Sequence, residues 1–75
     1  MRKGKQHWFC FSFQGPENGR GMGFACTYVG YLQRNVTMAM VTEQKSKCGL
    51  DANCVLLSVS YLGEMTREEF TGGIQ

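Results

Sequence analysis

The sequence lacks the residue patterns by which most enzymes and metalloproteins are recognised. It contains one histidine, His7, and none of its four cysteines belongs to a Cys-x-x-Cys pair. Structural zinc sites normally pair their ligands at such short spacing, so a metal site is not expected. His7 and Cys10 differ in parity along an extended segment and would point to opposite faces. We therefore predict a protein that is not an enzyme, with no catalytic residue, metal or cofactor.

Long apolar runs are missing as well. No segment approaches the roughly 18 residues that a membrane helix requires. The first residues are basic, but the segment that follows alternates in polarity and does not form the apolar core of a signal peptide. We therefore expect a cytoplasmic protein that does not contact a membrane. In that compartment the cysteines are expected to be buried free thiols that pack as small apolar groups: Cys10, Cys26, Cys48 and Cys54.

A glycine-rich segment, Gly19–Gly23, has a superficial likeness to a phosphate-binding loop. A dinucleotide or phosphate loop needs a strand before it and a helix after it. Here a strand is expected to follow, and no Lys-Ser or Lys-Thr pair completes the motif. We interpret the segment as part of a hairpin turn.

Length and composition predict one small folded domain over residues 1–75. The chain is 43% hydrophobic and 12% aromatic, which suits a globular rather than a disordered chain. A chain of this length buries only about 60% of the surface that its unfolded form exposes. One sheet packed against one helix therefore uses most of its apolar material. Residues 1–5 are expected to form a flexible basic arm, and residues 71–75 a flexible tail.

The first half of the chain is predicted to form a β-hairpin. Residues 6–13 alternate cleanly and place four rings on one face: His7, Phe9, Phe11 and Phe13. A turn with three glycines, a proline and an Asn-Gly pair follows over residues 14–21. The second strand is predicted over residues 22–32 and pairs antiparallel with the first.

Residues 36–47 are ambiguous between strand and helix. Their β-branched content would suit a strand, but the run Glu43-Gln44-Lys45 consists of good helix formers. Lys45 and Lys47 would complement the dipole of a last helical turn. Gly49 stands where a left-handed cap is expected. A helix that begins near Asn35 or Thr37 is therefore favoured.

The last third of the chain predicts one strand and one short helix. Residues 54–62 form the most apolar strand, expected to be covered on both faces in its first half and to end at Gly63. Thr66 and Glu69 have the spacing of a capping box. A single helical turn is expected over residues 67–70, and it should stop at Gly72-Gly73.

The order strand, strand, helix, strand predicts an α+β fold. A helix that crosses the sheet returns the third strand beside the first, so the sheet should be three-stranded and antiparallel in the order 2-1-3. One face carries the helix. Aromatic side chains on the opposite face would then be exposed or would pack against a second copy of the chain.

Two kinds of partner are compatible with these features. Nucleic acid could stack on the ring-bearing strand beside the basic arm, although the net charge of +2 is small for that role. A protein partner, including a second copy in a homodimer, suits the exposed aromatic and methionine residues and the edge strands. The residues that we predict to contact a partner are Arg2, Lys3, Lys5, Trp8, Arg20, Tyr28, Tyr31 and Arg34.

Two segments of the C-terminal half, residues 35–41 and 58–70, resemble small uncharacterised proteins encoded by bacteriophages and prophages. The resemblance is one of overall style over about half of the chain and brings no binding site with it. It implies a bacterial host cytoplasm. It also implies a protein that binds a host macromolecule, as do inhibitors of bacterial defence systems such as anti-CRISPR proteins.

Overall fold

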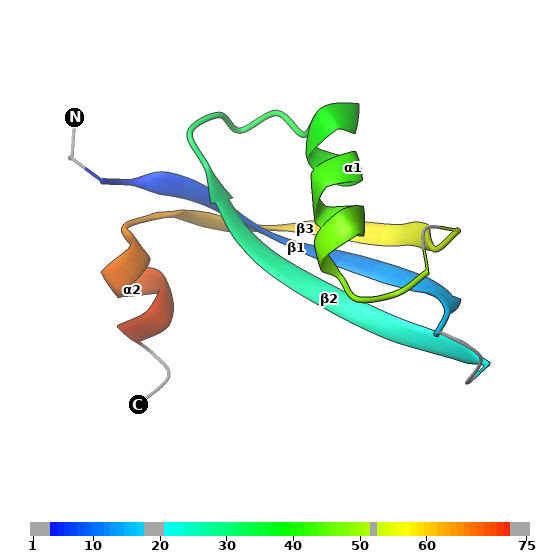
Figure 1. The fold of residues 1–75 in the computed structure, drawn as a ribbon. Coiled ribbons are helices and arrows are strands. Elements are labelled where there is room, and N and C mark those ends of the chain that lie inside the picture. The colour runs from blue at the N-terminus through cyan, green and yellow to red at the C-terminus, as the bar shows by residue number, and fades with distance from the viewer. Residues whose placement is uncertain (1–3, 18–20, 52, 73–75) are drawn as a thin grey trace.

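The chain folds into a three-stranded sheet with one helix on each side. The computed structural model describes residues 4–17, 21–51 and 53–72. Along the chain its elements are β1 (Gln6–Pro16), β2 (Met22–Tyr31), α1 (Met38–Lys47), β3 (Val55–Met65) and α2 (Arg67–Gly72). The sheet order is β2-β1-β3, and both pairs are antiparallel. In Figure 1, α1 lies across one face and the short α2 lies beyond one end of the other face. The predicted α+β class, the sheet order and the helix on one face are confirmed.

The core lies between β1 and α1. Phe9, Phe11 and Phe13 are at most 2% exposed. Met40 of α1 and Cys54 complete the buried cluster, and half-buried apolar residues surround it: Val29, Tyr31, Val41, Cys48, Leu50, Leu56 and Val59. Because β1 is the central strand, its period-two row of phenylalanines has a neighbour strand on both sides and the helix above.

Local signals fix the ends of α1. The Thr37 hydroxyl accepts a hydrogen bond from the Met40 amide at 3.3 Å, which makes Thr37 the N-cap. At the other end Gly49 has a φ of 85°, the left-handed conformation that favours glycine after a helix. The expected start near Asn35 or Thr37 and the glycine cap are therefore confirmed.

Polar contacts fasten α1 to β2. The Tyr31 hydroxyl donates to Glu43 Oε1 at 2.6 Å, and Gln44 Nε2 donates to the Tyr31 oxygen at 3.0 Å. Gln44 is 2% exposed, so its hydrogen bond to Tyr31 offsets part of the cost of burying an amide. Tyr31, which was predicted as a partner contact, makes these hydrogen bonds within the fold at the β2–α1 junction.

Two expectations for β3 are wrong. The strand does not end at Gly63 but continues to Met65, and Gly63 takes a φ of 124° inside it. Its first half is not covered on both faces, because Val55 is 55% and Leu57 is 51% exposed. The pairing of β3 with β1 shifts register between Trp8 and Phe9 and again between Ser12 and Phe13. Simple alternation does not anticipate such irregularities.

The cysteines are free thiols, as expected, but they are not all buried. Cys54 is fully buried, Cys10 and Cys48 are half-buried, and Cys26 is exposed. Cys54 Sγ lies 3.8 Å from Cys48 Sγ, and burial is the main reason that the pKa of Cys54 is raised. The backbone of Cys54 packs directly on Gly15, where a Cβ atom would stand 2.5 Å from the Cys54 Cα.

The predicted capping box opens α2. Thr66 N–H donates to Glu69 Oε1 at 2.8 Å, and the Glu69 amide donates to the Thr66 hydroxyl at 3.1 Å. The helix includes Thr71 and Gly72, which the sequence had assigned to a flexible tail. The rest of that tail and residues 1–3 of the basic arm lie outside the described residues.

Candidate interaction surface

The sheet face opposite α1, called the open face from here on, carries no charged side chain on its strands. Residues that pair directly across an antiparallel sheet share a face. The pairings place on it Trp8, Cys10, Ser12 and Gln14 from β1, Met22, Phe24, Cys26 and Tyr28 from β2, and Val55, Ser58 and Ser60 from β3. The middle strand is thus mostly small or polar here, and the larger apolar groups flank it.

Several of these apolar side chains have little cover. Phe24 is 73% exposed, Met22 63%, Tyr28 61% and Val55 55%. One large exposed apolar side chain on a monomer is unremarkable by itself, but four on one uncharged face make that face a candidate contact surface. Phe9, Phe11 and Phe13, which the sequence had offered as rings for stacking bases, form the core beneath α1. That row is not available to a partner.

The centre of the open face carries hydroxyl, thiol and phenol groups. The nearby Cys10 thiol, by its charge when ionised and by its hydrogen bond, raises the pKa of Tyr28, with a smaller contribution from Cys26. Ser12 Oγ and Cys26 Sγ are 3.6 Å apart. Thiols are weak hydrogen-bonding groups, and no charged side chain lies on these strands, so a contact made here would depend largely on shape and apolar area.

At one end, α2 covers part of the open face. The Trp8 indole is 5% exposed and stacks on Phe70 with ring centroids 4.2 Å apart and planes 4° apart. Trp8 Nε1 also donates to the Met65 carbonyl at 2.9 Å. Gly30 lies opposite Trp8 in the register, and a Cβ there would stand 2.9 Å from the indole. The glycine thus lets the ring lie over β2.

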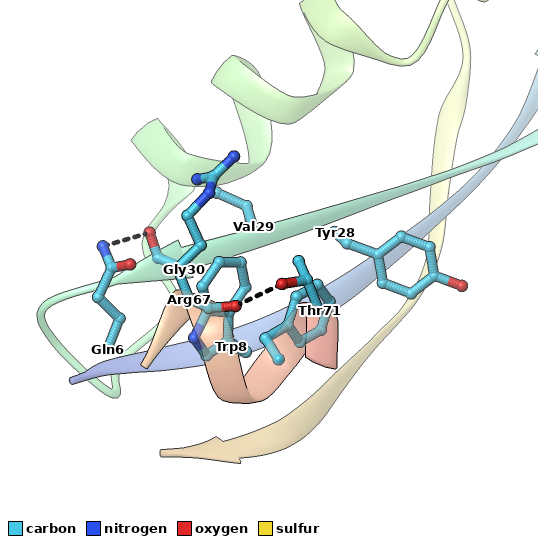
Figure 2. Close-up of a pocket in the computed structure, with 8 residues that line it drawn as sticks. Gln6, Trp8, Tyr28, Val29, Gly30, Arg67 and Thr71 are labelled. Carbon is cyan, nitrogen blue, oxygen red and sulfur yellow. Dashed lines mark hydrogen bonds between the residues drawn. The ribbon is translucent and has the colours of Figure 1, made fainter. Parts of the chain in front are cut away.

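A pocket of about 260 Å³ lies where α2 meets β2, lined by Gln6, Trp8, Tyr28, Val29, Gly30, Arg67, Phe70 and Thr71. Figure 2 shows Trp8 in its middle, Tyr28 at one end and Gln6 at the other, with the Arg67 side chain reaching from α2 toward Val29. Gln6 Nε2 donates to the Gly30 carbonyl at 3.3 Å, and the Thr71 hydroxyl donates to the Arg67 carbonyl at 3.0 Å.

The residues that line this pocket are suited to binding a side chain rather than to acid–base or nucleophilic catalysis. It offers aromatic faces, one guanidinium, one amide and two hydroxyls, with no carboxylate, histidine or thiol among them. Its volume lies below the roughly 300 Å³ at which small-molecule sites begin. We regard it as a notch at the end of the open face that could accept one side chain of a bound protein.

The residues predicted to contact a partner do not form one surface. Trp8 and Tyr28 belong to the open face, and Trp8 is covered by α2. Tyr31 and Arg34 lie on the α1 side, where the Arg34 guanidinium carbon is 4.7 Å from the Tyr61 ring centroid. Lys5 is half-buried just before β1. The other three lie outside the described residues: Arg2, Lys3 and Arg20.

His7 is part of a polar group at the edge of the core. Its Nδ1 lies 2.9 Å from the Tyr61 hydroxyl, and the Tyr61 ring packs against Phe9 with centroids 5.4 Å apart. With Arg34 also over the Tyr61 ring, the group lies at the end of the core near the β2–α1 connection. A nucleophile with a general base would need a thiol or hydroxyl aimed at the histidine and a third group to orient it. Among the described contacts of His7, the Tyr61 phenol is its hydrogen-bonding partner, and no third group orients the imidazole.

The predicted contact residues did not include Met22, Phe24 or Val55. Phe24 shares the parity of Tyr28 on β2, so the alternation of that strand already places both on one face. Val55 gave no such signal, since it belongs to the apolar run that was expected to be covered.

Neither metal-binding nor membrane-spanning features are found in the described parts of the chain. No group of three or more His, Cys, Asp or Glu residues among them could hold a metal ion. No helix in the same ranges is long and apolar enough to cross a membrane.

Comparisons with protein-family models, with curated proteins and with solved structures found no match for this chain.

Proposed function

We propose that this chain is a non-enzymatic protein that acts by binding another protein through the open face. The observation that carries the proposal is the row of exposed apolar side chains, Phe24, Tyr28 and Met22 on β2 with Val55 on β3, on strands that present no charge. Interface centres are depleted of charge and enriched in aromatic residues and methionine. The partner should accordingly present an apolar, uncharged surface patch.

The resemblance to phage and prophage proteins supports a more specific form of the proposal. The partner would then be a host protein or protein complex in a bacterial cytoplasm, and the chain would act as an inhibitor of a bacterial defence system. Inhibition by binding needs no catalytic residue, which fits the chemistry of the described side chains.

A single-stranded nucleic acid is the second candidate, supported by the exposed rings of Phe24 and Tyr28, on which bases could stack. Binding to nucleic acid depends on lysine and arginine side chains that neutralise phosphates. The strands of the open face supply none, and Arg67 stands at their edge. A protein partner is therefore favoured.

The test is capture of partners from bacterial lysate by the tagged protein, with and without nuclease, and with two variants. We expect a defined protein complex that survives nuclease and is lost when Phe24→Ser and Tyr28→Ser are combined. Met38→Ser is the matched control, because Met38 is 77% exposed but lies on α1. It should leave capture unchanged.

Two results would argue against the proposal. Equal capture by wild type and by the Phe24→Ser, Tyr28→Ser variant would remove the open face from the mechanism. Loss of all captured protein on nuclease treatment, together with binding of a single-stranded oligonucleotide that weakens steeply with salt, would establish the nucleic-acid alternative instead.

A further inference from the structure

β2 is an edge strand without the features that normally prevent edge-to-edge pairing. Natural sheets protect their edges with charged side chains, proline or bulges. From Met22 to Tyr31 the strand has no charged residue and no proline, and its pairing with β1 runs without a register shift. The other edge strand, β3, carries Glu64 and pairs through two register shifts. The two edges of the sheet are therefore not equivalent.

The hydrogen-bond pattern identifies which backbone groups of β2 face outward. The Glu17 amide donates to the Gly21 carbonyl at 2.9 Å, and these residues continue the register that pairs Pro16 with Met22. Bonded and non-bonded pairs alternate in an antiparallel ladder, so Pro16–Met22 is a non-bonded pair. The Pro16 carbonyl is consistent with this assignment, because it accepts a hydrogen bond at 2.9 Å from the Asp51 amide, which lies outside β2.

The same alternation applies to every second residue along β2. The N–H and C=O groups of Met22, Phe24, Cys26 and Tyr28 therefore point away from β1, beyond the edge of the sheet. At Gly30 the outward carbonyl is already used by Gln6 Nε2. The segment available to a further strand is thus Met22–Tyr28, and Ala25 is its midpoint.

We propose that a second copy of this chain pairs with this segment, β2 against β2, antiparallel about a two-fold axis at Ala25. Met22 then faces Tyr28 of the other copy, and Phe24 faces its Cys26, so that all four outward residues find hydrogen-bonding partners. A two-fold contact must be self-complementary. An uncharged strand meets its copy without like-charge repulsion, although each chain carries a net charge of +2.

Self-pairing has a consequence for the open face. It joins two three-stranded sheets into one continuous sheet, and it places the exposed rings of Phe24 and Tyr28 from both copies side by side. This inference does not depend on the proposed function, since the edge can pair whether or not the face binds a host protein.

The first test is the mass of the full chain in solution, measured by light scattering over a range of concentrations. We expect a change from 8.4 kDa to twice that mass as concentration rises. Cys26→Lys should raise the dimer dissociation constant about tenfold, because it brings two like charges together at the pairing edge. Ser60→Lys places the same charge on the open face at β3 and should leave the constant unchanged.

A second test measures the register between the two copies of β2 directly, and it does not depend on a variant that weakens the dimer. At the axis, Ala25 forms a non-bonded pair with its copy, with Cα atoms about 4.5 Å apart and within disulfide reach. Diamide, which takes up two hydrogens from two thiols, should link Ala25→Cys into a covalent dimer. Thr27→Cys, two residues away on the same strand, should not be linked, and wild type gives the background from the native cysteines.

Three results would overturn the proposal. The first is a mass of 8.4 kDa at every concentration. The second is equal weakening by Cys26→Lys and Ser60→Lys, which would indicate packing of two open faces instead of edge pairing. The third is equal crosslinking of the Ala25→Cys and Thr27→Cys variants, which would exclude the register.

Discussion

The Trp8 and Phe70 rings stack with centroids 4.2 Å apart and planes 4° apart, although 61 positions separate them in the sequence. This contact, with the hydrogen bond from Trp8 Nε1 to Met65, holds the six-residue α2 against the sheet. A helix of that length is not stable alone in water. Its position therefore depends on the packing of Phe70 against Trp8 and against Tyr28, whose ring centroid is 6.1 Å away.

Replacement of Phe70 by alanine should release α2 from the sheet. Trp8 is the single tryptophan of the chain, so its fluorescence emission should shift to the red as water reaches the indole. The free energy of unfolding should fall by about 1–2 kcal/mol, the sum of the lost stack and some lost burial. Glu68→Ala, an exposed change on the same helix, is the control. Unchanged emission in Phe70→Ala would show that α2 does not protect the indole.

The two faces of the sheet should respond in opposite ways to the loss of a phenylalanine. Phe11 is fully buried beneath α1, so Phe11→Ala should cost about 3–5 kcal/mol of unfolding free energy. Phe24 is 73% exposed, and Phe24→Ala should change stability by no more than about 0.5 kcal/mol. Urea denaturation of both variants measures the difference. Similar losses in the two would mean that the open face is covered in solution, as packing of two open faces or a bound partner would cause.

Gly15 should not tolerate even a methyl group. A Cβ there would overlap the Cys54 backbone, with its Cα at 2.5 Å and its amide nitrogen at 3.2 Å. Because backbone atoms cannot rotate aside, Gly15→Ala should destabilise the fold by about 1–3 kcal/mol or more. Gly72→Ala is a suitable comparison, since a Cβ at that position would meet nothing within 4 Å. Thermal unfolding of both proteins provides the measurement, and equal midpoints would refute the close contact.

The stability of the α1–β2 junction should depend on pH through Glu43 and Tyr31. The hydrogen bond from Tyr31, followed by the charge of Lys47, lowers the pKa of Glu43. A carboxyl whose pKa is lower in the folded state stabilises the fold above its unfolded-state pKa. That contribution is lost as pH falls through the lowered value. Burial, followed by the hydrogen bond to Glu43, raises the pKa of Tyr31. Its contribution is present below the unfolded-state pKa of tyrosine and is lost as pH rises through the raised value.

Urea midpoints measured across the pH range should therefore decline at both the acid and the alkaline end. Glu43→Gln should flatten the acid decline, because the amide cannot titrate, while Glu68→Gln on the exposed side of α2 should leave it as in wild type. An acid decline of the same size in Glu43→Gln and wild type would assign the effect to other carboxyl groups.

Much of the fold could be predicted because its signals are local. The alternating rings of residues 7–13, the lysines and Gly49 at the end of α1 and the Thr66–Glu69 capping box each act over a few residues. The sheet order could be predicted because a helix that crosses the sheet returns the third strand beside the first. The two errors in β3 depend on contacts between distant segments. Val55 is exposed because it lies on the face that α1 leaves open, and the residues after Gly63 extend the strand by pairing with β1; alternation within β3 carries no trace of either.

The candidate surface was predicted less well than the fold. Of the predicted contact residues, Tyr28 is exposed on the open face, and Trp8 lies on the same face but is covered by α2. Tyr31 and Arg34 proved to be engaged on the other side of the sheet. The type of side chain alone does not distinguish an aromatic residue that packs between two elements of the fold from one that is exposed and free to bind a partner. Both are amphipathic rings with one polar atom.

The sequence by itself determined which segments form strands and helices and which residues share a face, since these follow from periods of two and 3.6 residues and from capping groups. Only the tertiary structure decided which face of the sheet becomes the core. β1 carries rings on both faces, with Phe9, Phe11 and Phe13 on one and Trp8 on the other. The choice depends on where α1 and α2 pack: α1 lies across the face that carries the three phenylalanines, and α2 covers only one end of the other.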